Sequence, residues 1–75
     1  MSEHTLDAKR LLCPMPVIKT QQMVSNLKPG DKLTVICTDP GCLHDIPAWC
    51  RVHGHDVISS SQEEGEVVVT IQIQQ

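Results

Sequence analysis

Aromatic residues are almost missing from this chain, which has neither Phe nor Tyr and only one Trp, at position 49. Its core must therefore be built from Val, Ile, Leu and Met. With 75 residues it can bury only one modest core, near the lower size at which a fold is stable without disulfides or metals. We expect one domain over residues 1–75.

Basic clusters and long apolar runs are missing as well. The net charge is −3 and Lys and Arg are scattered, so no direct nucleic-acid interface is expected. No apolar run approaches the roughly 20 residues that cross a bilayer, and the first residues, MSEHTLDAKR, lack the apolar stretch of a signal peptide. These absences predict a cytoplasmic protein without membrane contact, and we expect a monomer when it is free.

Four cysteines stand out in so short a chain: Cys13, Cys37, Cys42 and Cys50. Without an export signal, buried, metal-binding or reactive thiols are favoured over structural disulfides. Cys37 shares the strand parity of Leu33 and Val35, which predicts a core position. Cys50 also indicates core or half-buried packing. Cys42 follows a turn and is predicted to be exposed.

Cysteine and histidine crowd into residues 37–55, which raises the question of a metal site. No spacing there repeats the Cys-X2-Cys pairs of structural zinc sites, so neither a metal nor a cofactor is expected. His53 and His55 are interpreted as cations favoured by a helix end. Asp39 and Asp45 are interpreted as turn and cap residues.

Hydrophobic periodicity predicts the order β-α-β-α-β-β. The expected strands cover residues 4–8, 32–38, 56–61 and 66–74, and the expected helices cover residues 14–27 and 43–53. Pro47 is placed in the first turn of the second helix and Gly54 at its C-terminal cap. The last strand has one apolar and one largely polar face, so both helices should cover one face of the sheet. The predicted fold is an α/β (α+β) two-layer sandwich with a four-stranded mixed sheet.

Cys13 lies where the first helix is predicted to begin, within LLCPMPVIKT. If it is the N-cap residue, Pro14 takes the first helical position and Pro16 the third. The backbone donors of Met15 and Val17 would then point toward the sulfur with the positive end of the helix dipole. This predicts a nucleophilic thiol with a lowered pKa, although simple packing stays open. Cys-X-X-Cys chemistry is excluded, because position 16 is Pro.

Five stretches of the chain carry a resemblance to a known family: LDAKRLLCPMPVI, KPGDKL, TDPG, DIPAWC and GH. Over residues 6–73 the chain resembles the TusA/SirA-type sulfur carrier proteins, and the Cys-Pro-X-Pro motif that begins at Cys13 is the most specific element. The resemblance implies that Cys13 accepts sulfane sulfur as a persulfide and hands it to another protein. Its supporting residues would be Pro14, Met15, Pro16 and Val17.

The resemblance also implies protein partners: a cysteine desulfurase, or rhodanese-like and DsrE-type sulfurtransferases. Such a carrier has no separate small-molecule active site, and its sulfur could enter tRNA thiolation, molybdenum cofactor synthesis or sulfur oxidation. We expect docking to use Arg10, Leu11 and Lys19. The family usually has a Gly in the loop where this chain carries Arg10 and Leu11, so a stiffer and more basic loop is expected.

Two other classes of function stay open. The first is a thiol redox sensor in which Cys13 pairs with another cysteine, Cys42 being the first candidate. The second is a regulatory protein-binding module in which Cys13 is structural. The mass change of the protein after exposure to a sulfur donor distinguishes these two from a carrier.

Overall fold

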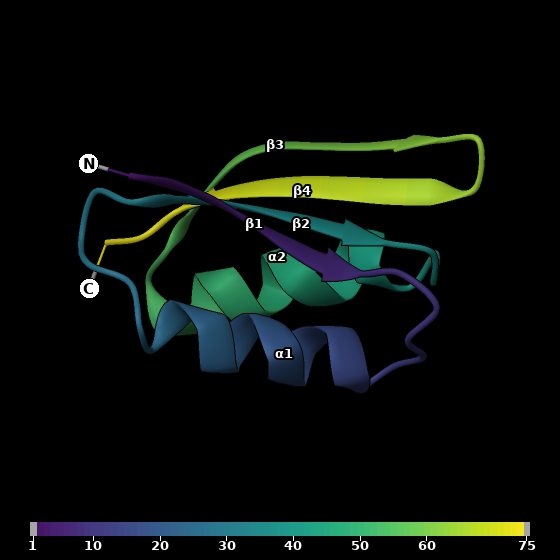
Figure 1. The fold of residues 1–75 in the computed structure, drawn as a ribbon, viewed down its shortest axis with the longest axis horizontal. Helices are drawn as coiled ribbons and strands as arrows, with labels where there is room; N and C mark the ends of the chain where they lie inside the picture. Colours follow the sequence, from purple (N-terminus) through teal and green to yellow (C-terminus); the bar gives the residue numbers. More distant parts are fainter. Residues whose placement is uncertain (1, 75) are drawn as a thin grey trace.

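The computed structural model describes residues 2–74 and shows the predicted two-layer sandwich (Figure 1). The elements are β1 (Glu3–Ala8), α1 (Met15–Val24), β2 (Lys32–Cys37), α2 (Cys42–His53), β3 (Asp56–Glu63) and β4 (Glu66–Gln72). Both helices lie on the same face of the sheet, as predicted from the polar side of the last strand. None of the helices in this part of the chain is long and apolar enough to cross a membrane.

The sheet is mixed, with the strand order β1-β2-β4-β3. β1 and β2 run parallel, while β4 is antiparallel to both of its neighbours. Ala8, the last residue of β1, pairs with Cys37, the last residue of β2. The loops that lead into α1 and α2 therefore leave the sheet at the same end, and this topology brings together residues far apart in sequence.

The core is formed by the helix-facing residues of β2 and β4 and by one stripe of each helix. The fully buried strand residues, each 0% exposed, are Ala8, Leu33, Val35, Cys37, Val67, Val69 and Ile71, and Ile73 just after β4 is buried to the same extent. The helices add Pro16, Thr20, Val24, Cys42, Ile46 and Cys50. This confirms the strand parity predicted from the alternation of apolar residues. β3, at one edge of the sheet, is exposed along its whole length.

The helices differ from the prediction in their bounds and in the place of Pro47, and α2 begins at Cys42, one residue earlier than predicted. α1 begins at Met15 with Pro14 as its N-cap, and it ends at Val24, before the turn that leads to Leu27. Pro47 lies inside α2 rather than in its first turn, where its missing N–H leaves one helical hydrogen bond unmade. Gly54 is the C-cap as predicted, with a φ of 78° that glycine adopts without steric cost.

The buried residues at the end of α2 include a histidine that was predicted to be a cation. His55 is only 9% exposed, its Nδ1 accepts a hydrogen bond from the Gln74 N–H at 3.1 Å, and its ring stacks on Trp49. Burial and the nearby His53 lower the pKa of His55. The prediction is therefore wrong for His55, because tertiary packing removes it from the water that would stabilise its charge.

Candidate functional site

Cys13 lies in the loop between β1 and α1 and is exposed. Its backbone N–H donates to Asp39 Oδ2 at 2.9 Å, across 26 positions of sequence. The other oxygen of Asp39 accepts a hydrogen bond from the Gly41 N–H at 3.0 Å. One carboxylate thus joins the loop before α1 to the loop before α2. These two backbone hydrogen bonds lower the pKa of Asp39, so the carboxylate is charged near neutral pH.

The Cys13 thiol donates to a second carboxylate, Asp45 Oδ2, at 3.1 Å. Asp45 lies in the first turn of α2 and is half-buried. The hydrogen bond to Asp45 is the main reason that the pKa of Cys13 is raised, and the negative charges of Asp45 and Asp39 act in the same direction. The predicted lowering of this pKa is therefore wrong. The sequence showed the helix start and its dipole, but not the acidic residues that the fold places beside the sulfur.

The start of α1 also differs from the predicted geometry around the sulfur. Cys13 precedes the N-cap rather than forming it, and the peptide bond that joins it to Pro14 is cis. The Met15 N–H donates to the Leu12 carbonyl at 2.9 Å, so this donor is not directed at the thiol. Pro16 is buried and its carbonyl accepts a hydrogen bond from Thr20 Oγ1 at 2.8 Å, which anchors the first turn.

Exposed apolar side chains lie close to Cys13 in the sequence. Leu12 is 76% exposed, and Met15 and Ile18, one helical turn apart on α1, are 39% and 38% exposed. Of the residues predicted to dock partners, Arg10 and Lys19 are exposed, but Leu11 is half-buried and packs against the core. The exposed leucine of the pair is Leu12, which the sequence prediction omitted. Residues 12, 15 and 18 are called the apolar rim below.

Arg10 adopts a conformation that disfavours side chains with a Cβ. Its φ is 67°, in the left-handed region, and its N–H donates to Thr38 Oγ1 at 2.8 Å. A glycine at this position would meet that requirement without strain. The loop is thus held at both Arg10 and Cys13 by residues that follow β2.

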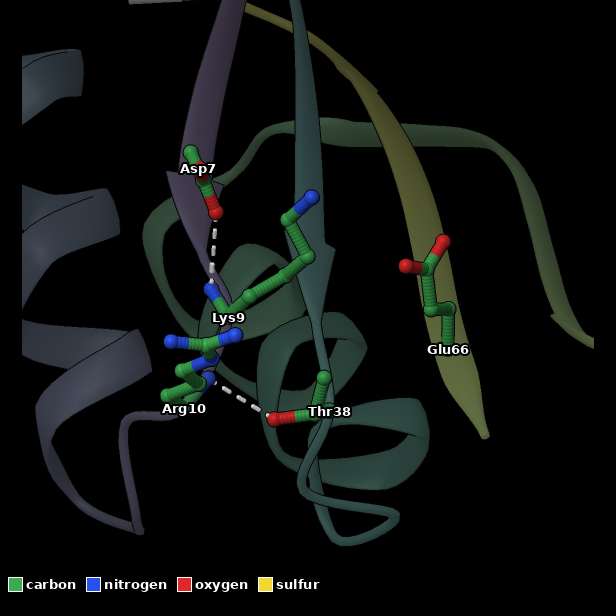
Figure 2. A pocket seen from close by; sticks show the side chains of 5 residues that line it. All are labelled: Asp7, Lys9, Arg10, Thr38 and Glu66. Atoms are coloured by element: carbon green, nitrogen blue, oxygen red, sulfur yellow. Dashed lines mark hydrogen bonds between the residues drawn. The ribbon is translucent and has the colours of Figure 1, made fainter. Parts of the chain in front are cut away.

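A hollow of about 500 Å³ lies at the same end of the sheet. Figure 2 shows Asp7 on β1, Lys9 and Arg10 after it, Thr38 after β2, and Glu66 on β4 around this hollow. The lining mixes both signs of charge and contains no cysteine. Its composition therefore offers no acceptor for sulfur, and we place the candidate site at Cys13 instead.

The other cysteines lie in the core. Cys37 and Cys50 are 0% exposed, as predicted, and burial raises the pKa of both thiols. Cys42 is 1% exposed, so its predicted exposure is wrong: it is the first residue of α2 and faces the sheet. Burial raises the pKa of Cys42 to about 12. Within residues 2–74 no three His, Cys, Asp or Glu side chains are grouped to hold a metal ion.

Asp39 and Asp45 are the site residues that sequence reasoning missed. Asp39 does shape the turn before α2, but N-capping of α2 is left to Gly41, and both carboxylates contact Cys13. A signal was present in the chain. Parallel neighbouring strands end at one edge of a sheet, so an acidic residue two positions after β2 should meet the loop that follows β1.

Comparisons with known proteins agree on one family. The family described as sulfurtransferase TusA matches residues 4–73. A protein of Neisseria meningitidis serogroup A, named as a sulfur carrier protein, is 35% identical over 72 residues, covering 96% of this chain and 97% of that protein. YrkI of Bacillus subtilis, also named as a sulfur carrier, is 39% identical over 67 residues, covering 89% of this chain and 88% of YrkI.

The fold has a solved counterpart as well. The crystal structure of the SirA-like protein from Desulfitobacterium hafniense matches with a TM-score of 0.83. The match covers 96% of this chain and 99% of that one, at 23% sequence identity. At this identity the likeness supports the fold, and the functional argument depends on the closer relatives.

Proposed function

Because the chain belongs to the TusA family of sulfur carriers, we propose that Cys13 accepts sulfane sulfur as a persulfide and relays it to partner proteins. The observation that carries this proposal is the contrast among its cysteines. Cys13 is exposed, whereas the other three are at most 1% exposed. Only Cys13 can therefore meet the cysteine of another protein without unfolding of the core.

The transfer consumes neither oxidant nor cofactor. The Cys13 sulfur, as thiolate, attacks the outer sulfur of a donor persulfide. A new S–S bond forms at Cys13, the S–S bond of the donor breaks, and the donor cysteine leaves as a thiolate that takes up a proton. Delivery repeats the exchange, with the thiolate of the acceptor attacking the outer sulfur on Cys13.

The surface around Cys13 supports protein partners rather than a small substrate. The apolar rim and the exposed cations Arg10 and Lys19 offer the mixed surface on which a second protein can dock. A cysteine desulfurase, a rhodanese-like or a DsrE-type sulfurtransferase would present its own reactive cysteine there. The relay would serve tRNA thiolation, molybdenum cofactor synthesis or sulfur oxidation. The free thiols of the protein fit the reducing cytoplasm, and we propose that the protein acts there as a monomer.

The test is to incubate the full chain with a cysteine desulfurase and cysteine, and then to measure the mass of the Cys13 peptide. We expect it to gain the mass of one sulfur atom, and a reductant should remove it. Loss of two hydrogens from the protein would instead indicate a redox sensor that forms a disulfide. An unchanged mass would favour a binding module and contradict the proposed relay.

A further inference from the structure

Two carboxylates contact Cys13 without a cation to balance them. Asp39 accepts the Cys13 N–H and Asp45 accepts the thiol. Among residues 2–74 the one close contact between a basic and an acidic side chain joins His4 to Asp31, at the opposite end of β1, so neither Asp39 nor Asp45 is paired with Lys, Arg or His. An anionic sulfur at Cys13 would thus become a third negative charge in one small region. Coulomb repulsion at these distances opposes its formation.

The groups that raise the pKa of Cys13 all come from the segment that leads into α2 and from its first turn. Asp39 precedes α2, and Cys42 and Asp45 lie in the first turn of α2. All of them act to raise the pKa of Cys13, and the hydrogen bond with Asp45 acts most strongly. The free carrier therefore keeps its sulfur mainly as a thiol at neutral pH. A thiol is a poor nucleophile and is oxidised slowly, which protects an exposed cysteine between encounters.

We propose that Asp45 acts as a charge gate on Cys13. Its carboxylate keeps the Cys13 thiol protonated in the free carrier, and a sulfur donor removes this effect by placing a Lys or Arg side chain against Asp45 and Asp39. The inference rests on the proposed relay and specifies the chemistry of the donor. A donor should carry a cationic side chain beside its persulfide-bearing cysteine. With a protein that lacks such a cation, Cys13 should react slowly.

The gate also distinguishes the empty carrier from the loaded one. When the cation neutralises Asp45, the Cys13 thiol loses its proton to water and its sulfur attacks the outer sulfur of the donor. The leaving thiolate of the donor takes a proton from water, so protons balance. Sγ of the loaded cysteine carries no hydrogen and cannot donate to Asp45. The anionic outer sulfur is then repelled by both carboxylates and turns outward, toward an acceptor.

The first test measures the rate of Cys13 alkylation by iodoacetamide against pH, read from the Cys13 peptide of the intact chain. Asp45→Asn keeps the size of the side chain and removes its charge, so the midpoint should fall to lower pH. Because more of the thiol is then ionised at a given pH, alkylation at neutral pH should be several-fold faster. Asp56→Asn, at the opposite end of the sheet from Asp39, is the control and should match wild type. A midpoint unchanged in Asp45→Asn would overturn the proposal.

The second test uses the wild-type chain and does not depend on how the variant folds. Thiol–disulfide exchange at Cys13 is timed with cystamine, which is cationic, and with dithiodipropionate, which is anionic. We expect cystamine to react several-fold faster, with an advantage that shrinks at high salt. Equal rates at low salt would contradict the gate. Neither test involves sulfur transfer. The carrier proposal fails if Cys13 gains no sulfur from a donor, and that result is independent of the two tests of the gate.

Discussion

The exposed Cys13 and the buried Cys37, Cys42 and Cys50 have raised pKa values for different reasons. Burial is the main cause for the three core thiols, and it takes Cys42 to about 12 and Cys50 to about 11. For Cys13 the main cause is the Asp45 hydrogen bond. Burial changes only if the protein unfolds, whereas a partner can neutralise a carboxylate. The comparison teaches that two unreactive thiols can differ in kind. A thiol whose pKa is raised by burial stays unreactive in the folded protein, whereas one whose pKa is raised by a carboxylate can be activated by a partner.

The largest effect that separates the two groups should come from Cys13→Ser. We expect this variant to lose sulfur loading completely, because the hydroxyl cannot form a persulfide, while its thermal unfolding midpoint stays at the wild-type value. Mass spectrometry after incubation with a desulfurase and circular dichroism melting provide the two measurements. Cys50→Ser is the matched control and should still load. Sulfur on the Cys13→Ser protein would show that another cysteine is the acceptor.

The buried thiols should make the free energy of unfolding depend on pH in the alkaline range. The raised pKa values of Cys42 and Cys50 mean that the unfolded chain releases protons first, so stability is full below the ordinary thiol pKa of 9.0 and falls as pH rises toward about 11 and 12. Each thiol removes up to about 1.4 kcal/mol per pH unit in that window. Urea unfolding at several pH values from about 8 to 10 measures the slope of the free energy of unfolding against pH. Cys42→Ala should flatten this slope, because it removes one of the buried thiols whose pKa is raised.

Within the core group, Cys37→Ser should destabilise the protein by about 1–3 kcal/mol, because it places a hydroxyl in an apolar site. Cys37 is 0% exposed at the end of β2. Sulfur loading on Cys13 should stay at the wild-type level under conditions where the variant is folded. A urea unfolding curve that overlays wild type would contradict the core assignment, and loss of loading by the folded variant would contradict the separation between the two groups.

The smallest effect concerns the charge on the loop that carries Cys13. Arg10→Glu should slow sulfur transfer from a donor with an acidic face at low salt, and the difference should shrink as salt rises, because rim charges act mainly on association rate. Rapid-mixing transfer assays at two salt concentrations measure it. Lys32→Glu, which makes the same charge change at the other end of β2, is the control. Equal rates for Arg10→Glu and wild type at low salt would leave Arg10 without a role in docking.

Most of the fold could be predicted from local patterns. The alternation in β2 and β4 and the helical spacing in α1 and α2 show, within each segment, which face is buried. The errors fall at junctions. Pro47 was placed too early in α2, and Cys42 was taken for an exposed turn residue. At junctions the outcome depends on which neighbour the chain meets, and local propensity carries little information about that.

The sequence by itself determined the two-layer fold, the position of Cys13 at the entry to α1 and the core positions of Cys37 and Cys50, because these follow from periodicity and from the Cys-Pro-X-Pro motif. Only the tertiary structure decided the charge around Cys13. Parallel pairing of β1 with β2 brings Asp39 and Asp45 to the thiol from 26 and 32 positions away. Electrostatic interactions depend on distance in space rather than along the chain, so the direction of the Cys13 pKa shift had to come from the fold.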